Sequence, residues 1–117
     1  MREIKLARTV WANMELAKLC PGNDINRINE VLSNTDFVAQ MQSAMRIICI
    51  MSEAYERKEK SNNPNYEPNP ITEDELIELT EEEIGEALNL ALESFHKDGE
   101  QTVIAQPKKG SKKKVTR

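Results

Sequence analysis

The stretch FVAQMQSAMRIICIMSEAYERKEK, residues 37–60, carries one helical pattern from end to end. Its apolar side chains recur at the three- and four-residue spacing that places them on one helix face. They are Phe37, Met41, Ala44, Met45, Ile48, Met51 and Tyr55. Further apolar residues in the middle widen this stripe to nearly all sides, as is typical of a helix buried by several neighbours. We therefore expect residues 37–60 to form the central helix of the fold, with the polar turns YERKEK projecting into solvent.

Two shorter helices are expected upstream, over about residues 9–19 and 24–32. The tetrapeptide CPGN, residues 20–23, separates them, because Pro and Gly suit the central positions of a type II turn. Gly22 would take the positive φ that this turn requires. The pattern of residues 1–8 leaves open whether they are extended or begin the first helix.

The segment downstream of the central helix starts with SNNPNYEPNP, residues 61–70. Its three prolines disfavour helix, so we expect a linker there. Two helix starts follow, ITEDEL at 71–76 and LTEEEI at 79–84. Each has a Thr three residues before a Glu, with apolar residues on both sides, which is the signature of a capping box with a hydrophobic staple. The second helix is expected to end at Asp98 and Gly99.

These elements predict one all-α domain, a small bundle of about five helices. Residues 1–60 form its N-terminal part, residues 61–70 the linker, and residues 71–99 complete the same domain. Residues 100–117 are expected to be a flexible basic tail. Within that tail, the apolar run VIA at 103–105 leaves open a short strand.

The charge is divided between the body and the tail. The chain has a net charge of −4, but residues 108–117 carry +6 and residues 1–107 carry −10. An acidic body does not favour contacts with phosphates, so nucleic-acid binding would depend on the tail alone. The tail has no aromatic residue that stacks on bases. Its candidate contact residues are Lys108, Lys109, Lys112, Lys113 and Lys114.

No arrangement of residues indicates an enzyme, a cofactor or a metal site. His96 is the single histidine, and Cys20 and Cys49 form no spacing typical of a metal or a disulfide framework. No glycine pattern indicates a phosphate-binding loop. The apolar run IICIM, residues 47–51, is too short to span a bilayer, and residues 1–10 do not resemble a signal peptide. We expect a cytoplasmic, non-enzymatic protein without cofactors that does not associate with membranes.

Four stretches together resemble a known family. They are ELAKLCPGNDINRINEVL at 15–32, NPNYEPNPIT at 63–72, the acidic capped helix ending in ALESFHKDG at 91–99, and the Lys/Gly tail. In this arrangement the chain resembles the tail assembly chaperones of long-tailed phages and prophages of Gram-positive bacteria. The resemblance covers residues 1–117 and rests on overall arrangement, not on a catalytic motif.

The resemblance implies a helical, non-enzymatic protein made in the host cytoplasm and absent from the finished virion. Its partners would be the tape measure protein, which it keeps soluble, and the major tail protein, whose subunits it recruits. Many members of the family also occur as a longer product of a ribosomal frameshift, and KKGSKKK at 108–114 fits an A-rich slippery run. The resemblance leaves open whether the chain forms homo-oligomers.

No binding residue transfers by motif, so the candidate partner contacts follow from physical chemistry. Methionine on an apolar helix face adapts to varied partner helices, although it also fills cores. Acidic helix starts can dock a basic segment, although they are also ordinary solvated surfaces. The candidates are Met41, Met45, Ile48, Met51, Tyr55, Glu73, Asp74, Glu75 and Glu78. The competing hypotheses are an accessory protein that binds nucleic acid through the Lys tail, and a helical head–tail adaptor.

Overall fold

The structure is a computed structural model, which describes residues 4–33, 36–93 and 102–105. Those ranges contain five α-helices, so the helical fold predicted from the sequence is confirmed. The elements in chain order are β1 (Ile4–Ala7), α1 (Val10–Ala17), the 3₁₀ turns η1 (Pro21–Asn23) and η2 (Ile25–Arg27), α2 (Ile28–Leu32), α3 (Phe37–Asn62), α4 (Glu73–Leu76), α5 (Glu81–Glu93) and β2 (Thr102–Ala105).

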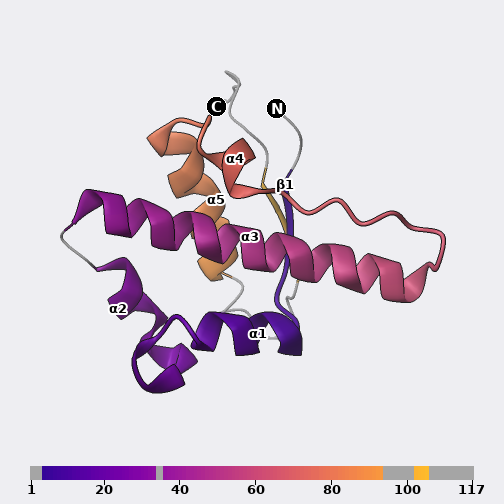
Figure 1. The fold of residues 1–117 in the computed structure, drawn as a ribbon, viewed down its shortest axis with the longest axis horizontal. Helices are drawn as coiled ribbons and strands as arrows, with labels where there is room; N and C mark the ends of the chain where they lie inside the picture. Colours follow the sequence, from indigo (N-terminus) through magenta and orange to yellow (C-terminus); the bar gives the residue numbers. More distant parts are fainter. Residues whose placement is uncertain (1–3, 34–35, 94–101, 106–117) are drawn as a thin grey trace.

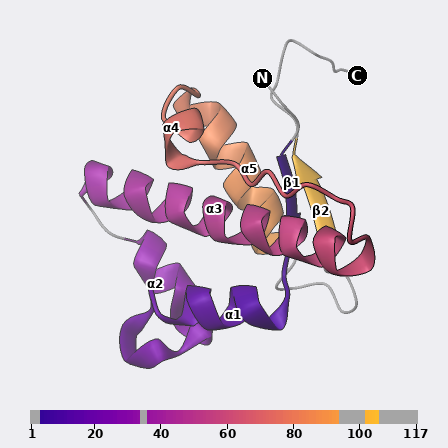
Figure 2. The same ribbon diagram turned by 45° about the vertical axis from the view of Figure 1, so that its right-hand side comes forward.

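The long helix α3 lies across the middle of the molecule, as expected of residues 37–60 (Figure 1). Helices α1 and α2 lie on one side of it and α4 on the other, while β1 and α5 run side by side behind it (Figures 1 and 2). All five of these elements contact α3. Ile47, Ile48 and Met51 on α3 are fully buried. The core therefore forms around the middle of α3, where the apolar stripe is widest.

The chain ends meet in a two-stranded antiparallel sheet. Ile4 pairs with Ala105 and Ala7 pairs with Thr102. Residues 4–7 are therefore extended, which settles the alternative that the sequence left open. Within the predicted flexible tail, the sequence left open a short strand at VIA, and the structure shows that strand: Thr102–Ala105 form β2, whose β-branched run pairs with the free edge of β1. A flexible conformation is therefore not what these four residues adopt. The other residues of the predicted tail lie outside the described residues.

The predicted helix starts are confirmed by hydrogen bonds. The Thr72 hydroxyl accepts from the Glu75 N–H (3.3 Å), and the Glu75 carboxylate accepts from the Thr72 N–H (3.0 Å). Thr80 and Glu83 repeat this box at 3.1 and 2.9 Å. Gly22 has the expected positive φ of 64°. The predicted end of the second helix, at residues 98–99, lies outside the described residues.

The Pro/Asn linker is held along α3. The Tyr66 hydroxyl and the Asn69 N–H both donate to Glu56 Oε1, at 2.6 and 2.9 Å. The Ile71 N–H donates to the Ser52 hydroxyl at 2.9 Å. Glu56 is only 7% exposed, so the expectation that YERKEK projects into solvent is wrong for this residue. Its burial follows from these donors, because a carboxylate is tolerated in the interior only when it is hydrogen-bonded.

Candidate partner-binding site

An open apolar groove lies between the first turns of α3 and the corner that joins α4 to α5. Its volume is about 360 Å³. The side chains that line it are Phe37, Val38, Met41, Gln42 and Met45 from α3, and Leu76, Ile77, Leu79, Glu81 and Ile84 from the corner. We refer to these ten residues as the apolar groove.

Local sequence explains how the apolar groove forms. Asp36 caps α3 by accepting a hydrogen bond from the Ala39 N–H at 3.4 Å, so α3 begins directly at two apolar residues, Phe37 and Val38. On the other side, α4 ends after four residues and the Thr80–Glu83 capping box starts α5 in a new direction. Two capped helix starts therefore bring apolar side chains together at one end of the molecule.

Several of these side chains are exposed to an unusual degree. Phe37 is 54% exposed, Val38 59% and Ile77 66%. Leu76 and Ile84, at the base of the groove, are almost fully buried. The groove thus has a base that belongs to the core and walls of large apolar side chains that face solvent. Large apolar side chains that are exposed side by side make this groove a candidate interaction site.

The structure divides the apolar candidates into two groups. Met41 and Met45 line the groove and are half-buried. Ile48 and Met51 are fully buried, so their prediction as partner contacts is wrong. Tyr55 is half-buried and lies near Lys5, whose Nζ is 5.8 Å from the ring centroid, away from the groove. Periodicity identified the apolar face of α3 but did not show which part of it other elements cover.

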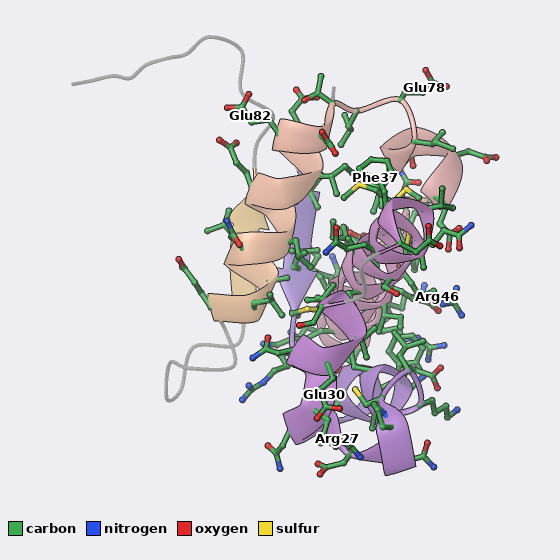
Figure 3. The ribbon with its side chains drawn as sticks, turned by 90° about the vertical axis from the view of Figure 1, so that its left-hand side faces the viewer. Arg27, Glu30, Phe37, Arg46, Glu78 and Glu82 are labelled. Carbon is green, nitrogen blue, oxygen red and sulfur yellow. The ribbon has the colours of Figure 1, made fainter. Side chains whose placement is uncertain are left out.

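The four acidic candidates also fall into two groups, two with contacts to other side chains or to the backbone and two that are exposed. Glu73 lies 3.8 Å from Arg46 of α3, and Glu75 belongs to the α4 capping box. Asp74 and Glu78 are exposed, and Glu78 stands between the groove residues Ile77 and Leu79 in the α4–α5 turn. Figure 3 shows Glu78 at the same end of the molecule as Phe37. The candidates Lys108, Lys109, Lys112, Lys113 and Lys114 lie outside the described residues.

The sequence pointed to part of the apolar stripe over residues 37–55 and to the acidic segment 73–86 as the contact regions, but it did not single out Phe37, Val38, Ile77, Leu79 or Glu81. A signal for some of them was present. Phe37 and Val38 are adjacent apolar residues at the start of α3, and Leu76 at the end of α4 is followed by Ile77, its C-cap, which keeps a helical backbone conformation. Neighbours in such a conformation point about 100° apart. Leu76 is fully buried while Ile77 is 66% exposed, which shows this divergence directly.

The two thiols are placed where they react poorly. Burial raises the pKa of the Cys49 thiol to about 11, and the nearby Glu73 carboxylate adds to this. Burial also raises the pKa of Cys20, whose Sγ donates to the Leu16 carbonyl at 3.4 Å. Because the thiolate is the nucleophile, both thiols are in the unreactive protonated form at neutral pH.

A second cavity of about 410 Å³ is polar in character. It is lined by Arg8, Asn13, Ile25, Asn26, Ile28, Asn29 and Leu92. The buried Asn13 Oδ1 accepts no hydrogen bond from the described residues, and such an atom is commonly satisfied by water. None of the predicted contact residues within the described ranges lines this cavity.

Comparisons of the chain with protein-family models, with curated proteins and with solved structures found no match. Within the described ranges, no cluster of three or more His, Cys, Asp or Glu side chains could hold a metal ion. No helix in that part of the chain is long and apolar enough to cross a membrane.

Proposed function

We propose that this protein is a non-enzymatic assembly chaperone that holds an apolar helical segment of its client in the apolar groove. The resemblance to phage tail assembly chaperones suggests the client, the tape measure protein, and a second partner, the major tail protein. In this proposal the protein acts in the host cytoplasm and is left out of the finished virion.

The observation that carries the proposal is the exposure of Phe37, Val38 and Ile77 around a base that includes Met41 and Met45. An amphipathic helix that lays its apolar face into such a groove is a recurrent mode of peptide recognition. Methionine side chains in the groove can adapt to different apolar residues along a long client. The net charge of −4 supports solubility of the complex, because like-charged particles repel one another.

The proposal is tested by co-expressing the full chain with the proposed client, a long helical tape measure protein, followed by affinity purification and sizing. We expect co-purification, and precipitation of the client when it is expressed alone. Val38→Asp and Ile77→Asp should each abolish co-purification, because a carboxylate in the groove must lose its hydration when the client docks.

Val10→Asp is the matched control. Val10 is 75% exposed on α1, outside the groove, so the same type of substitution there should leave co-purification intact. Equal loss of the client with the control and the groove variants would contradict a role for the groove. A client that is soluble alone and never co-purifies would contradict the chaperone function. Recovery of the protein in purified particles would favour a head–tail adaptor instead.

A further inference from the structure

From the charges at the edge of the apolar groove, we infer that its occupant is a short amphipathic helix whose apolar stripe is flanked by Lys or Arg. This inference rests on the proposed function and specifies the chemistry of the client segment. The inference states which helices the groove prefers. Whether the groove binds any helix at all is a separate question with a separate test.

The length of the groove sets the length of the segment. On α3 the groove extends from Phe37 to Met45, which corresponds to about 12 Å along the helix axis. A docked helix covers that distance with about two turns, presenting apolar residues at positions i, i+3 or i+4, and i+7. The contact therefore has room for three or four apolar side chains and for the residues that flank them.

The charged residues at the edge have one sign. Glu81 lines the groove, and Glu78 lies in the turn between the lining residues Ile77 and Leu79. Glu78 and Glu81 are both exposed. Among the described residues that line the groove, none is Lys or Arg. Flanking basic residues on the occupant would meet these carboxylates, while flanking acidic residues would be repelled.

The groove itself discriminates little between apolar side chains. Met41, Met45 and Gln42 are unbranched and flexible, so they repack around different partners. Specificity then has to come from the edge, where Glu78 and Glu81 have fixed positions in the backbone because the Thr80–Glu83 capping box orders the turn. Charge, more than shape, is thus the selective feature.

The same charges argue against two other occupants. A second copy docked groove to groove would place Glu78 and Glu81 against the identical carboxylates of its partner, which is unfavourable. The basic C-terminal segment of this chain has the right charge, but Val115 is its single large apolar residue between positions 106 and 117. That composition cannot fill a groove of about 360 Å³ lined mainly by apolar side chains.

The experiment measures the binding of three labelled helical peptides of about 15 residues to the full chain by fluorescence anisotropy. The first has a Leu stripe flanked by Lys, the second has the same stripe flanked by Glu, and the third has the Lys residues with the Leu positions scrambled. We expect the first peptide to bind about ten-fold more tightly than the second, with the difference shrinking at high salt. Of the two peptides that carry Lys, the one with scrambled Leu positions should bind more weakly.

A charge-reversal pair tests whether the edge residues are responsible. Glu78→Lys/Glu81→Lys should remove or invert the preference between the first two peptides. The control is Glu67→Lys/Glu82→Lys, which changes the net charge equally and also alters the first turn of α5. Glu82 does not line the groove and lies on the side of α5 away from Phe37 (Figure 3), so the control should keep the preference.

The outcomes separate the two proposals. Equal affinity for the Lys- and Glu-flanked peptides would overturn the inference and leave the groove as a helix-binding site. Equal binding of the scrambled peptide would also overturn it, because attraction would then be purely electrostatic. If neither Leu-stripe peptide binds, or if sizing shows a dimer that Ile77→Asp dissociates, the groove does not receive a client helix and both proposals fail.

Discussion

At the residue scale, one carboxylate connects the linker to the central helix. Glu56 Oε1 accepts hydrogen bonds from Tyr66 and Asn69, and Ser52 one turn earlier accepts from Ile71. These contacts fix the path of residues 61–72 and therefore the position at which α4 begins. The positions of Leu76 at the base of the groove and of Ile77 in its wall thus depend on the polar contacts of Ser52 and Glu56. These two residues lie about two to three turns of α3 beyond Met45, the last residue of α3 that lines the groove.

We predict that Tyr66→Phe lowers the free energy of unfolding by about 1.5 kcal/mol at neutral pH, the usual size of a hydrogen bond to a charged group. The Asn69 N–H still satisfies Glu56 in this variant, so the fold is retained. Urea unfolding followed by circular dichroism measures the change. Tyr55→Phe is the control, because the Tyr55 hydroxyl takes no part in the hydrogen bonds that hold the linker on α3. Equal losses in the two variants would contradict this role for Tyr66.

The same contact predicts a dependence on pH. The hydrogen bond to Glu56 raises the pKa of Tyr66 to about 12, whereas an unfolded tyrosine titrates near about 10. Below the unfolded value both states are protonated and the stabilisation is complete. As the pH rises from about 10 to about 12, the unfolded chain loses its proton first, so stability falls. The parent protein should therefore lose more stability than Tyr66→Phe across this range, and identical pH profiles would refute the prediction.

At the element scale, α5 begins where its capping box begins. The Thr80 hydroxyl and the Glu83 carboxylate satisfy N–H groups that the first turn of any helix leaves unpaired. We predict that Thr80→Ala lowers the free energy of unfolding by about 1 kcal/mol, while Thr80→Ser keeps the hydroxyl and most of the stability. Thermal unfolding of both variants measures this. If Thr80→Ser is as destabilising as Thr80→Ala, the methyl group and not the cap is responsible.

The capped helix starts and the central helix were predictable from the sequence, because the residue patterns that specify them lie within a few turns of one another. The capping boxes at Thr72 and Thr80 place donors and acceptors three residues apart, and the stripe of α3 repeats within one helix. Burial was less predictable, because it depends on which distant element covers each residue. The sequence pattern treats Met45 and Met51 alike, yet Met45 lines the groove and Met51 is fully buried.

At the scale of the whole molecule, the pairing of the two chain ends was the feature most difficult to predict. Ile4 and Ala105 are neighbours in the sheet but lie at opposite ends of the sequence. Each strand has only four residues, too few for a clear alternating pattern. The apolar side chains of Ile4 and Leu6 are buried, so β1 belongs to the core. The pairing with β2 places a segment from the far end of the sequence directly beside β1, where both strands contact α5 (Figure 2).

We predict that removal of β2 destabilises the whole domain and not just its edge. A chain ending at residue 101 leaves the backbone groups of β1 that pair with β2 without partners, with an expected loss of about 2–3 kcal/mol in the free energy of unfolding. A chain ending at residue 105 keeps the sheet and serves as the control for removal of the basic segment. Urea unfolding compares the two, and hydrogen exchange at the β1 amides reports the pairing directly. If both truncated chains are equally stable and their β1 amides exchange at the same rate, the sheet contributes nothing to the fold. If the shorter chain alone loses protection in β1 and also in the buried turns of α3, the two ends of the chain act as one cooperative unit with the central helix.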